Sequence, residues 1–126
     1  MLASGSKGNA IYVSDGQTAI LIDAGLSGRE IETRLRRQNL DPHDLKAILV
    51  THEHHDHVGG IGPLARRYDL PVYIDHQTHA ALPKLGNISD LNLFEAGDQF
   101  QVKGLSVASF STTHDAINPV GFVIES

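Results

Sequence analysis

Hydrophobic residues in this chain occur in short runs that are separated by turn-forming residues. The runs at residues 19–22 and 47–50 are continuously apolar, which is typical of strands buried on both faces of a sheet. Residues 9–14 and 18–23 are predicted to be strands joined by a turn at Asp15-Gly16. Further strands are predicted at residues 72–75, 92–95, 99–102, 105–111 and 121–125.

Three helices are predicted between these strands. Ser27 and Glu30 have the spacing of a capping box, which opens a helix that extends to about residue 39. Shorter helices are predicted at residues 63–68 and 76–82, and Pro83 ends the second. The alternation of strands and helices predicts an α/β fold, and the strand-rich C-terminal part indicates a mixed, α+β type of sheet. With 126 residues the chain is expected to form one domain, residues 1–126.

Composition narrows the class of protein. Hydrophobic residues make up 40% of the chain and charged residues 20%, so a packed core is expected. The net charge of −5 does not favour binding to nucleic acid through net charge alone. The absence of cysteine excludes disulfides, cysteine-type zinc sites and iron–sulfur clusters. No apolar run approaches the roughly 18 residues of a membrane span and no secretory signal is found, so a cytoplasmic location without membrane contact is predicted.

The strongest chemical signal is a cluster of histidines and acids at residues 52–57, within the segment 51–60 that directly follows the apolar run 47–50. Four histidines within six positions would repel one another on protonation, whereas a metal ion binds neutral imidazoles and carboxylates together. The cluster starts like the zincin motif His-Glu-x-x-His, but residue 56 is Asp, and a preceding strand with a following Gly-Gly favours a loop over a helix. The sequence therefore predicts a metal site on a strand-to-helix loop.

Spacing within the cluster suggests how its members divide. His52 and His54 lie two apart, so in an extended segment they project to the same side and can bind one ion. Asp56 and His57 follow after the chain turns and can face a second ion, whereas His55 points away. One further ligand is needed from elsewhere, and His114, just after the predicted strand 105–111, is the best candidate.

These residues resemble the metallo-β-lactamase superfamily. Residues 51–60 match its signature, residues 21–25 resemble its Asp-x-Gly element, and His114 matches its third histidine motif. Residues 2–9 and 114–121 are similar to the YycJ/WalJ-like branch of bacterial metal-dependent hydrolases. The resemblance implies the N-terminal half of an αββα sandwich, incomplete at its C-terminal end. Family members continue with a metal-bridging aspartate and a later histidine, and no residue here matches either.

The resemblance also implies roles for these residues. It gives one metal to His52, His54 and His114, and a second metal to Asp56 and His57. Asp23 would orient a ligand or the cluster loop without binding the metal itself, although a simple turn aspartate is an equal alternative. Two zinc ions are the expected cofactor, with manganese or iron as alternatives, and they would share a bridging hydroxide that attacks phosphorus.

The expected function is that of a phosphodiesterase or nuclease, similar to a DNA exonuclease, with nucleic acid or another phosphodiester as its substrate. Ser6 and Lys7 in a glycine-rich segment are candidate phosphate contacts, with a flexible turn as the alternative. Two other functions stay open: a thioester, lactone or β-lactam hydrolase of the same superfamily, and a non-catalytic half-domain that binds metal with a partner.

Other polar residues are interpreted as surface positions. These are the histidines three apart on a predicted helix, His76 and His79, and the main basic residues, Arg34, Arg36, Arg37, Arg66 and Arg67. Because half of a sandwich leaves a sheet face uncovered, an open apolar face is expected, and self-association through it is predicted.

Overall fold

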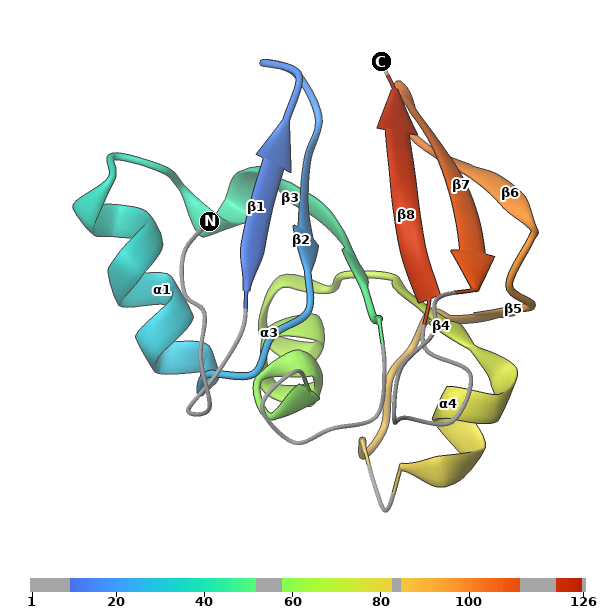
Figure 1. Ribbon diagram of the computed structural model, residues 1–126. Helices are drawn as coiled ribbons and strands as arrows, with labels where there is room; N and C mark the ends of the chain where they lie inside the picture. The colour runs from blue at the N-terminus through green and yellow to red at the C-terminus, as the bar shows by residue number, and fades with distance from the viewer. Residues whose placement is uncertain (1–9, 52–57, 83–84, 112–119, 126) are drawn as a thin grey trace.

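The computed structural model describes residues 10–51, 58–82, 85–111 and 120–125 (Figure 1). Its elements in chain order are β1 (Ile11–Ser14), β2 (Ala19–Ile22), α1 (Gly28–Arg37), the 3-10 helix η1 (Pro42–Asp44), β3 (Leu45–Leu49), α3 (Ile61–Tyr68), β4 (Val72–Asp75), α4 (His76–Ala81), β5 (Leu91–Phe94), β6 (Gln99–Val102), β7 (Leu105–Ser111) and β8 (Val120–Glu125).

The first sheet is mixed and has the strand order β1-β2-β3-β4-β5. β1 and β2 are antiparallel, whereas β2, β3, β4 and β5 run parallel to one another. The Asp15 carboxylate accepts hydrogen bonds from the backbone N–H groups of Gln17 and Thr18, at 2.9 and 2.8 Å, and thereby fixes the β1–β2 turn. These hydrogen bonds lower the pKa of Asp15. The predicted mixed sheet is confirmed.

Helices α1 and α3 cover one face of the first sheet (Figure 1). The hydroxyl of Ser27 accepts a hydrogen bond from the backbone N–H of Glu30 at 3.2 Å, so the predicted N-terminal cap of α1 is confirmed. Ile31 and Leu35 lie one turn apart on the buried side of α1 and pack in the same core as Ile48 of β3.

β6, β7 and β8 form a separate antiparallel sheet, which covers the other face of the first sheet. Leu49 and Tyr73 face this second sheet, and Tyr73 stacks on Phe100 of β6 with ring centroids 4.6 Å apart. The sequence analysis assigned all strands to one sheet. This was wrong for β6–β8, because the connection after β5 crosses to a second layer.

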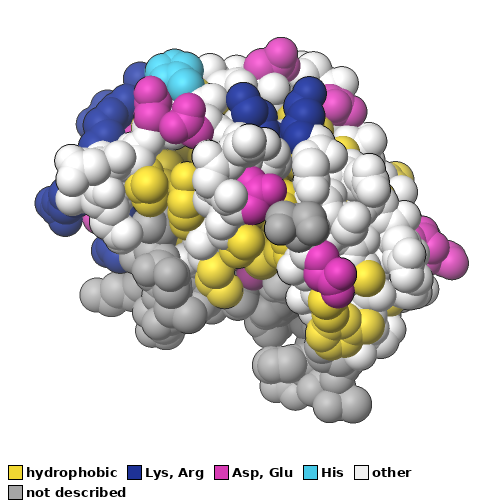
Figure 2. All heavy atoms as spheres, turned by 90° about the horizontal axis from the view of Figure 1, so that it is seen from above, with side chains coloured by type: hydrophobic (Ala, Val, Ile, Leu, Met, Phe, Trp, Pro, Cys, Tyr) yellow, Lys and Arg dark blue, Asp and Glu magenta, His cyan; other side chains and the backbone are white. Residues whose placement is uncertain are grey.

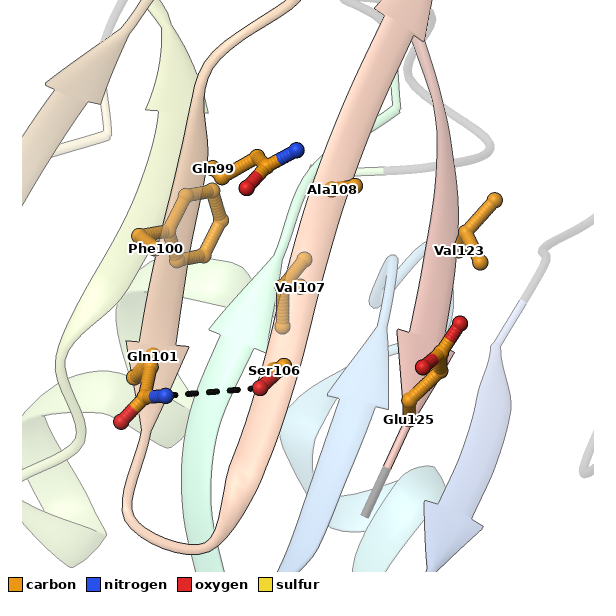
Figure 3. Close-up of a pocket in the computed structure, with 8 residues that line it drawn as sticks. All are labelled: Gln99, Phe100, Gln101, Ser106, Val107, Ala108, Val123 and Glu125. Atoms are coloured by element: carbon orange, nitrogen blue, oxygen red, sulfur yellow. Dashed lines mark hydrogen bonds between the residues drawn. The ribbon is translucent and has the colours of Figure 1, made fainter.

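A sheet face is open, as expected, but it belongs to the second sheet. This outer face carries exposed polar side chains and the half-exposed Phe110 and Val123 (44% and 50% exposed). A pocket of about 280 Å³ lies over β6, β7 and β8 on this side (Figure 3). Its lining includes Gln101, Ser106 and Glu125, so the open face has mixed polarity rather than being purely apolar. Self-association through this face stays a prediction.

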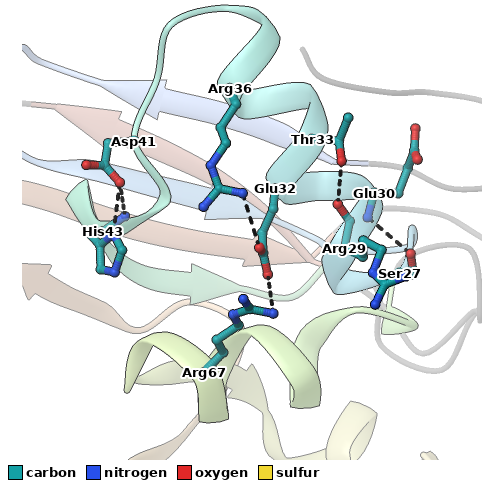
Figure 4. A network of polar contacts seen from close by, with 9 residues as sticks. All are labelled: Ser27, Arg29, Glu30, Glu32, Thr33, Arg36, Asp41, His43 and Arg67. Atoms are coloured by element: carbon teal, nitrogen blue, oxygen red, sulfur yellow. Dashed lines mark hydrogen bonds and ion pairs between the residues drawn. The ribbon is translucent and has the colours of Figure 1, made fainter.

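A polar network joins α1 to α3 (Figure 4). The carboxylate of Glu32 is 7% exposed, and its oxygens lie 3.5 Å from Arg36 and 3.4 Å from Arg67. Burial and a hydrogen bond with Glu32 raise the pKa of Tyr68 at the end of α3. The buried carboxylate therefore connects the two helices that cover the first sheet.

The molecular surface carries both signs of charge. Seen from above, Lys and Arg side chains gather mostly along one side and are intermixed with Asp and Glu (Figure 2). Within the described residues, no helix is long and apolar enough to cross a membrane.

Candidate metal centre

The candidate site lies at the edge of the first sheet where β2 and β3 end. Because these strands are parallel, the residues that follow them meet at the same edge. The backbone N–H of Asp23 donates to the carbonyl oxygen of Leu49 at 2.7 Å and extends the pairing by one step. Asp23 then adopts a left-handed conformation, with φ of 64°, which ends β2 and redirects the chain.

The Asp23 carboxylate binds the residue that immediately precedes the histidine cluster. Its Oδ1 accepts from the backbone N–H of Thr51 at 2.8 Å, and its Oδ2 accepts from the Thr51 hydroxyl at 2.6 Å. Asp23 is only 4% exposed, so these bonds are shielded from water. Two hydrogen bonds to one carboxylate fix the position and direction in which the chain enters residues 52–57.

The other side of the cluster is tied to the same segment. Gly60, which caps α3, donates its backbone N–H to the carbonyl oxygen of Ala24, the residue after Asp23. A Cβ atom at Gly60 would overlap the carbonyl oxygen of Leu26. The close approach of Gly60 to the chain after β2 therefore requires glycine. Thr51 on one side of residues 52–57 and Gly60 on the other are thus both hydrogen-bonded to the chain that follows β2.

Thr51 also connects the cluster to the second sheet. Its carbonyl oxygen accepts from the backbone N–H of Val120 at 2.9 Å. Val120 is the first residue of β8 and follows directly after residues 112–119, which include His114. One hydrogen bond thus joins the start of the cluster segment to the end of the segment with the predicted third histidine.

Most of the predicted site residues lie outside the described residues. These are the candidate ligands and the candidate phosphate contacts, namely His52, His54, Asp56, His57, His114, Ser6 and Lys7. The bystander His55 lies there as well. The structure brings together the described residues that flank the two histidine-bearing segments.

The donor set of this site fits a metal ion of the zinc class. Its side chains offer imidazole nitrogens and a carboxylate, which are ligands that zinc, manganese and iron accept in proteins. Elsewhere, across the residues that the structure describes, no three His, Asp or Glu side chains come together to form a rival site. Asp23 is placed to support the fit, because it hydrogen-bonds to Thr51, the residue directly before the first candidate ligand.

Several other polar residues have structural partners. Arg34 lies 3.0 Å from Glu30, and His76 lies 3.6 Å from Glu95. The guanidinium of Arg66 donates to the carbonyl oxygens of Leu85 and Asn87, at 3.1 and 3.2 Å. Arg66 is exposed, as expected of a surface position, and its two hydrogen bonds also hold the loop before β5 against α3.

The sequence analysis missed Thr51 and Asp75 as functional candidates. Thr51 directly precedes the cluster and has no distinctive sequence signal. Its contacts with Asp23 and Val120 are visible only in the structure. Asp75 has a local signal, since it precedes a helix in the N-cap position, but that signal gives no hint of its other contacts.

Comparison with known proteins identifies the family. A sequence model described as the metallo-beta-lactamase superfamily matches residues 3–123, and the chain therefore belongs to this superfamily. The chain is 43% identical over 129 residues to the exodeoxyribonuclease YycJ of Bacillus anthracis, covering 100% of this chain and 49% of that protein. It is 41% identical over 124 residues to the exodeoxyribonuclease WalJ of Streptococcus pneumoniae serotype 2 (strain D39 / NCTC 7466), covering 94% and 46%.

Solved structures agree with this family. The chain resembles the Rm3 metallo-beta-lactamase with a TM-score of 0.78 and 26% identity, over 97% of this chain and 52% of that one. The expected superfamily, the YycJ/WalJ-like resemblance and the relation to half of a metallo-β-lactamase fold are confirmed. The chain spans about half the length of the curated relatives that it matches.

Proposed function

We propose that this chain is the metal-binding N-terminal part of a hydrolase that cleaves phosphodiester bonds in DNA, in the manner of an exonuclease. The observation that carries the proposal is the hydrogen bonding of Thr51, which joins Asp23, the start of the histidine cluster and Val120. This arrangement supports a single site to which both sheets contribute ligands.

In this proposal two metal ions, zinc by default, are held by residues of this chain. One ion takes His52, His54 and His114, and the other takes Asp56 and His57. Bound metals of this kind supply Lewis acidity and an activated water for attack at phosphorus. Asp23 acts on the site through Thr51, because its two hydrogen bonds hold the chain that leads into His52.

A phosphodiester substrate is favoured by the relatives that carry exodeoxyribonuclease names. The net charge of −5 means that DNA must be attracted by local positive groups rather than by the whole chain. Two metal ions would supply such charge, and Ser6 and Lys7 are proposed as additional phosphate contacts. Because the proposed substrate is DNA, we also propose that the protein acts in the cytoplasm.

The metal part of this proposal is tested by substitution within the cluster. The purified chain is loaded with zinc, and bound metal per chain is measured by elemental analysis. His54→Ala is expected to lose most of the bound zinc, whereas the matched variant His55→Ala keeps it. Equal loss in both variants would contradict the division between ligands and bystander.

The substrate is tested on the same zinc-loaded chain. End-labelled linear duplex DNA, a thioester and a β-lactam are offered in parallel, with His54→Ala as the control. Shortening of the DNA from an end by the unmodified chain alone supports the proposal. Turnover of only the thioester or the lactam would favour another hydrolase of the superfamily, and zinc binding without any turnover would favour the partner-dependent half-domain.

A further inference from the structure

Asp75 is a buried carboxylate at the end of β4 that binds two separate elements. The residue is 0% exposed. Its Oδ1 accepts from the backbone N–H groups of Gln77 and Thr78, at 2.8 and 3.3 Å, and so caps α4. Its Oδ2 accepts from the backbone N–H of Ala96 at 3.2 Å. The second bond reaches the turn at residues 95–98, where the chain passes from the first sheet to the second.

Ser109 of β7 holds the same 95–98 turn from the other sheet. Its hydroxyl donates to the carbonyl oxygen of Asp98 at 2.8 Å, and its carbonyl oxygen accepts from the backbone N–H of Gly97 at 3.1 Å. Ser109 is 5% exposed, so this contact is also shielded from water. The 95–98 turn is therefore fixed between a side chain of the first sheet and a strand of the second.

Asp75 and Ser109, which hold the 95–98 turn from its two sides, both lie next to segments of the candidate metal centre. β3 and β4 are parallel with Leu49 opposite Tyr73, so Thr51 and Asp75 come at the same level of the same sheet edge. On the other side, Ser109 lies two residues before the end of β7, after which residues 112–119 begin. The connection thus runs from beside the start of the cluster to the strand that leads into the segment with His114.

We propose that Asp75 is a positioning residue of the metal centre, which acts through the 95–98 turn and Ser109 to set the place of His114 relative to the histidine cluster. The inference rests on the proposed function, because it takes His114 as a ligand. Metal–ligand distances are tolerated within about 0.2 Å, so a small shift of the strand before His114 is enough to weaken binding. Removing a supporting contact of this kind typically lowers metal affinity about 10–100-fold.

The test variant is Asp75→Asn in the 126-residue chain. Asparagine keeps an oxygen for the cap of α4, but its NH₂ group faces the N–H of Ala96 and cannot accept from it. Zinc affinity is measured by competition with a chromogenic chelator, and unfolding of the metal-free chain is measured in urea. We expect about tenfold weaker zinc binding. His76→Ala is the matched control, since it removes an exposed contact between α4 and the same turn.

Ser109→Ala provides a second variant at the other end of the connection, with the exposed Ser106→Ala on the same strand as its control. We expect Ser109→Ala to weaken zinc binding in the same direction as Asp75→Asn, and Ser106→Ala to leave it unchanged. If both Asp75→Asn and Ser109→Ala bind zinc as tightly as the unmodified chain, the inference is wrong.

A double-mutant cycle with His114→Ala separates this inference from the proposed site. If Asp75 acts through His114, Asp75→Asn has no further effect on zinc affinity in the His114→Ala chain. An equal loss in both backgrounds would mean that Asp75 supports the fold in general, and would overturn the inference. If His114→Ala itself leaves zinc affinity unchanged, the proposed ligand set is at fault, and the inference falls with it.

Discussion

The two sheets of this chain differ in what covers them. In the first sheet, β3 is buried on both faces, and Ala47, Ile48 and Leu49 are each 0% exposed. In the second sheet, β7 alternates, with Leu105 and Val107 buried and Ser106 exposed. A continuous apolar run in the sequence therefore indicates a strand that lies between two layers. Alternation of apolar and polar residues indicates a strand with one open face.

The largest expected effect comes from truncating a side chain between the two sheets. Leu49→Ala removes a fully buried side chain from the core that joins the sheets, and we expect it to lower the free energy of unfolding by about 2–5 kcal/mol. Val123→Ala on the outer face is expected to change it by no more than about 0.5 kcal/mol. Urea denaturation measures both, and equal costs would show that the outer face is buried in solution.

The second comparison uses the same substitution at two glycines. Gly60→Ala places a methyl group against the backbone carbonyls of Ala24 and Leu26, which cannot move aside, and we expect a loss of about 1–3 kcal/mol. At Gly121 the atoms nearest to an added methyl group belong to the ring of Phe110, a side chain that is 44% exposed rather than fixed backbone. We expect Gly121→Ala to cost less than about 1 kcal/mol. Thermal unfolding ranks the two, and the reverse order would contradict this account.

The smallest expected effect is a change in the pKa of a tyrosine, compared between Tyr68 in α3 and Tyr73 in β4. Burial and then Glu32 raise the pKa of Tyr68, whereas burial and then Asp90 raise that of Tyr73 between the sheets. Glu32→Gln removes a negative charge, so we expect the pKa of Tyr68 to fall while that of Tyr73 is unchanged. Ring resonances followed by NMR across the titration distinguish the two residues.

The sign of the matching stability effect follows from these raised values. A raised tyrosine pKa means that the folded state keeps a proton that the unfolded state releases above about pH 10. This contribution to stability is therefore present below about pH 10 and is lost as the pH rises through the folded-state pKa. Glu32→Gln is expected to make the alkaline loss of stability less steep, which urea midpoints at several pH values measure.

Much of the fold could be predicted because its signals are local. The apolar run at residues 19–22 and the cap at Ser27 gave β2 and the start of α1 correctly. The predicted helix at residues 76–82 corresponds to α4, His76–Ala81. The division into two sheets could not be predicted, since strand length and alternation do not show that the chain changes layer after β5.

The candidate site shows the same division between local and non-local information. Residue types and spacing within the cluster point to a metal without any structure. Asp23 was proposed to orient the cluster loop, and its hydrogen bonds to Thr51 are consistent with that role. The bonds of Thr51 to Val120 and of Asp75 to Ala96 join residues far apart in sequence, and no periodicity encodes them.

The hydrogen bond between Thr51 and Val120 has a consequence for the order of folding. β6, β7 and β8 pair with their sequence neighbours, so they close short loops at low entropic cost. The Thr51–Val120 bond closes a much longer loop, so its entropic cost is higher and we expect it to form later than the pairing of β6, β7 and β8. We therefore expect the two segments that carry the candidate ligands to come together late in folding, after the strands of the second sheet have paired.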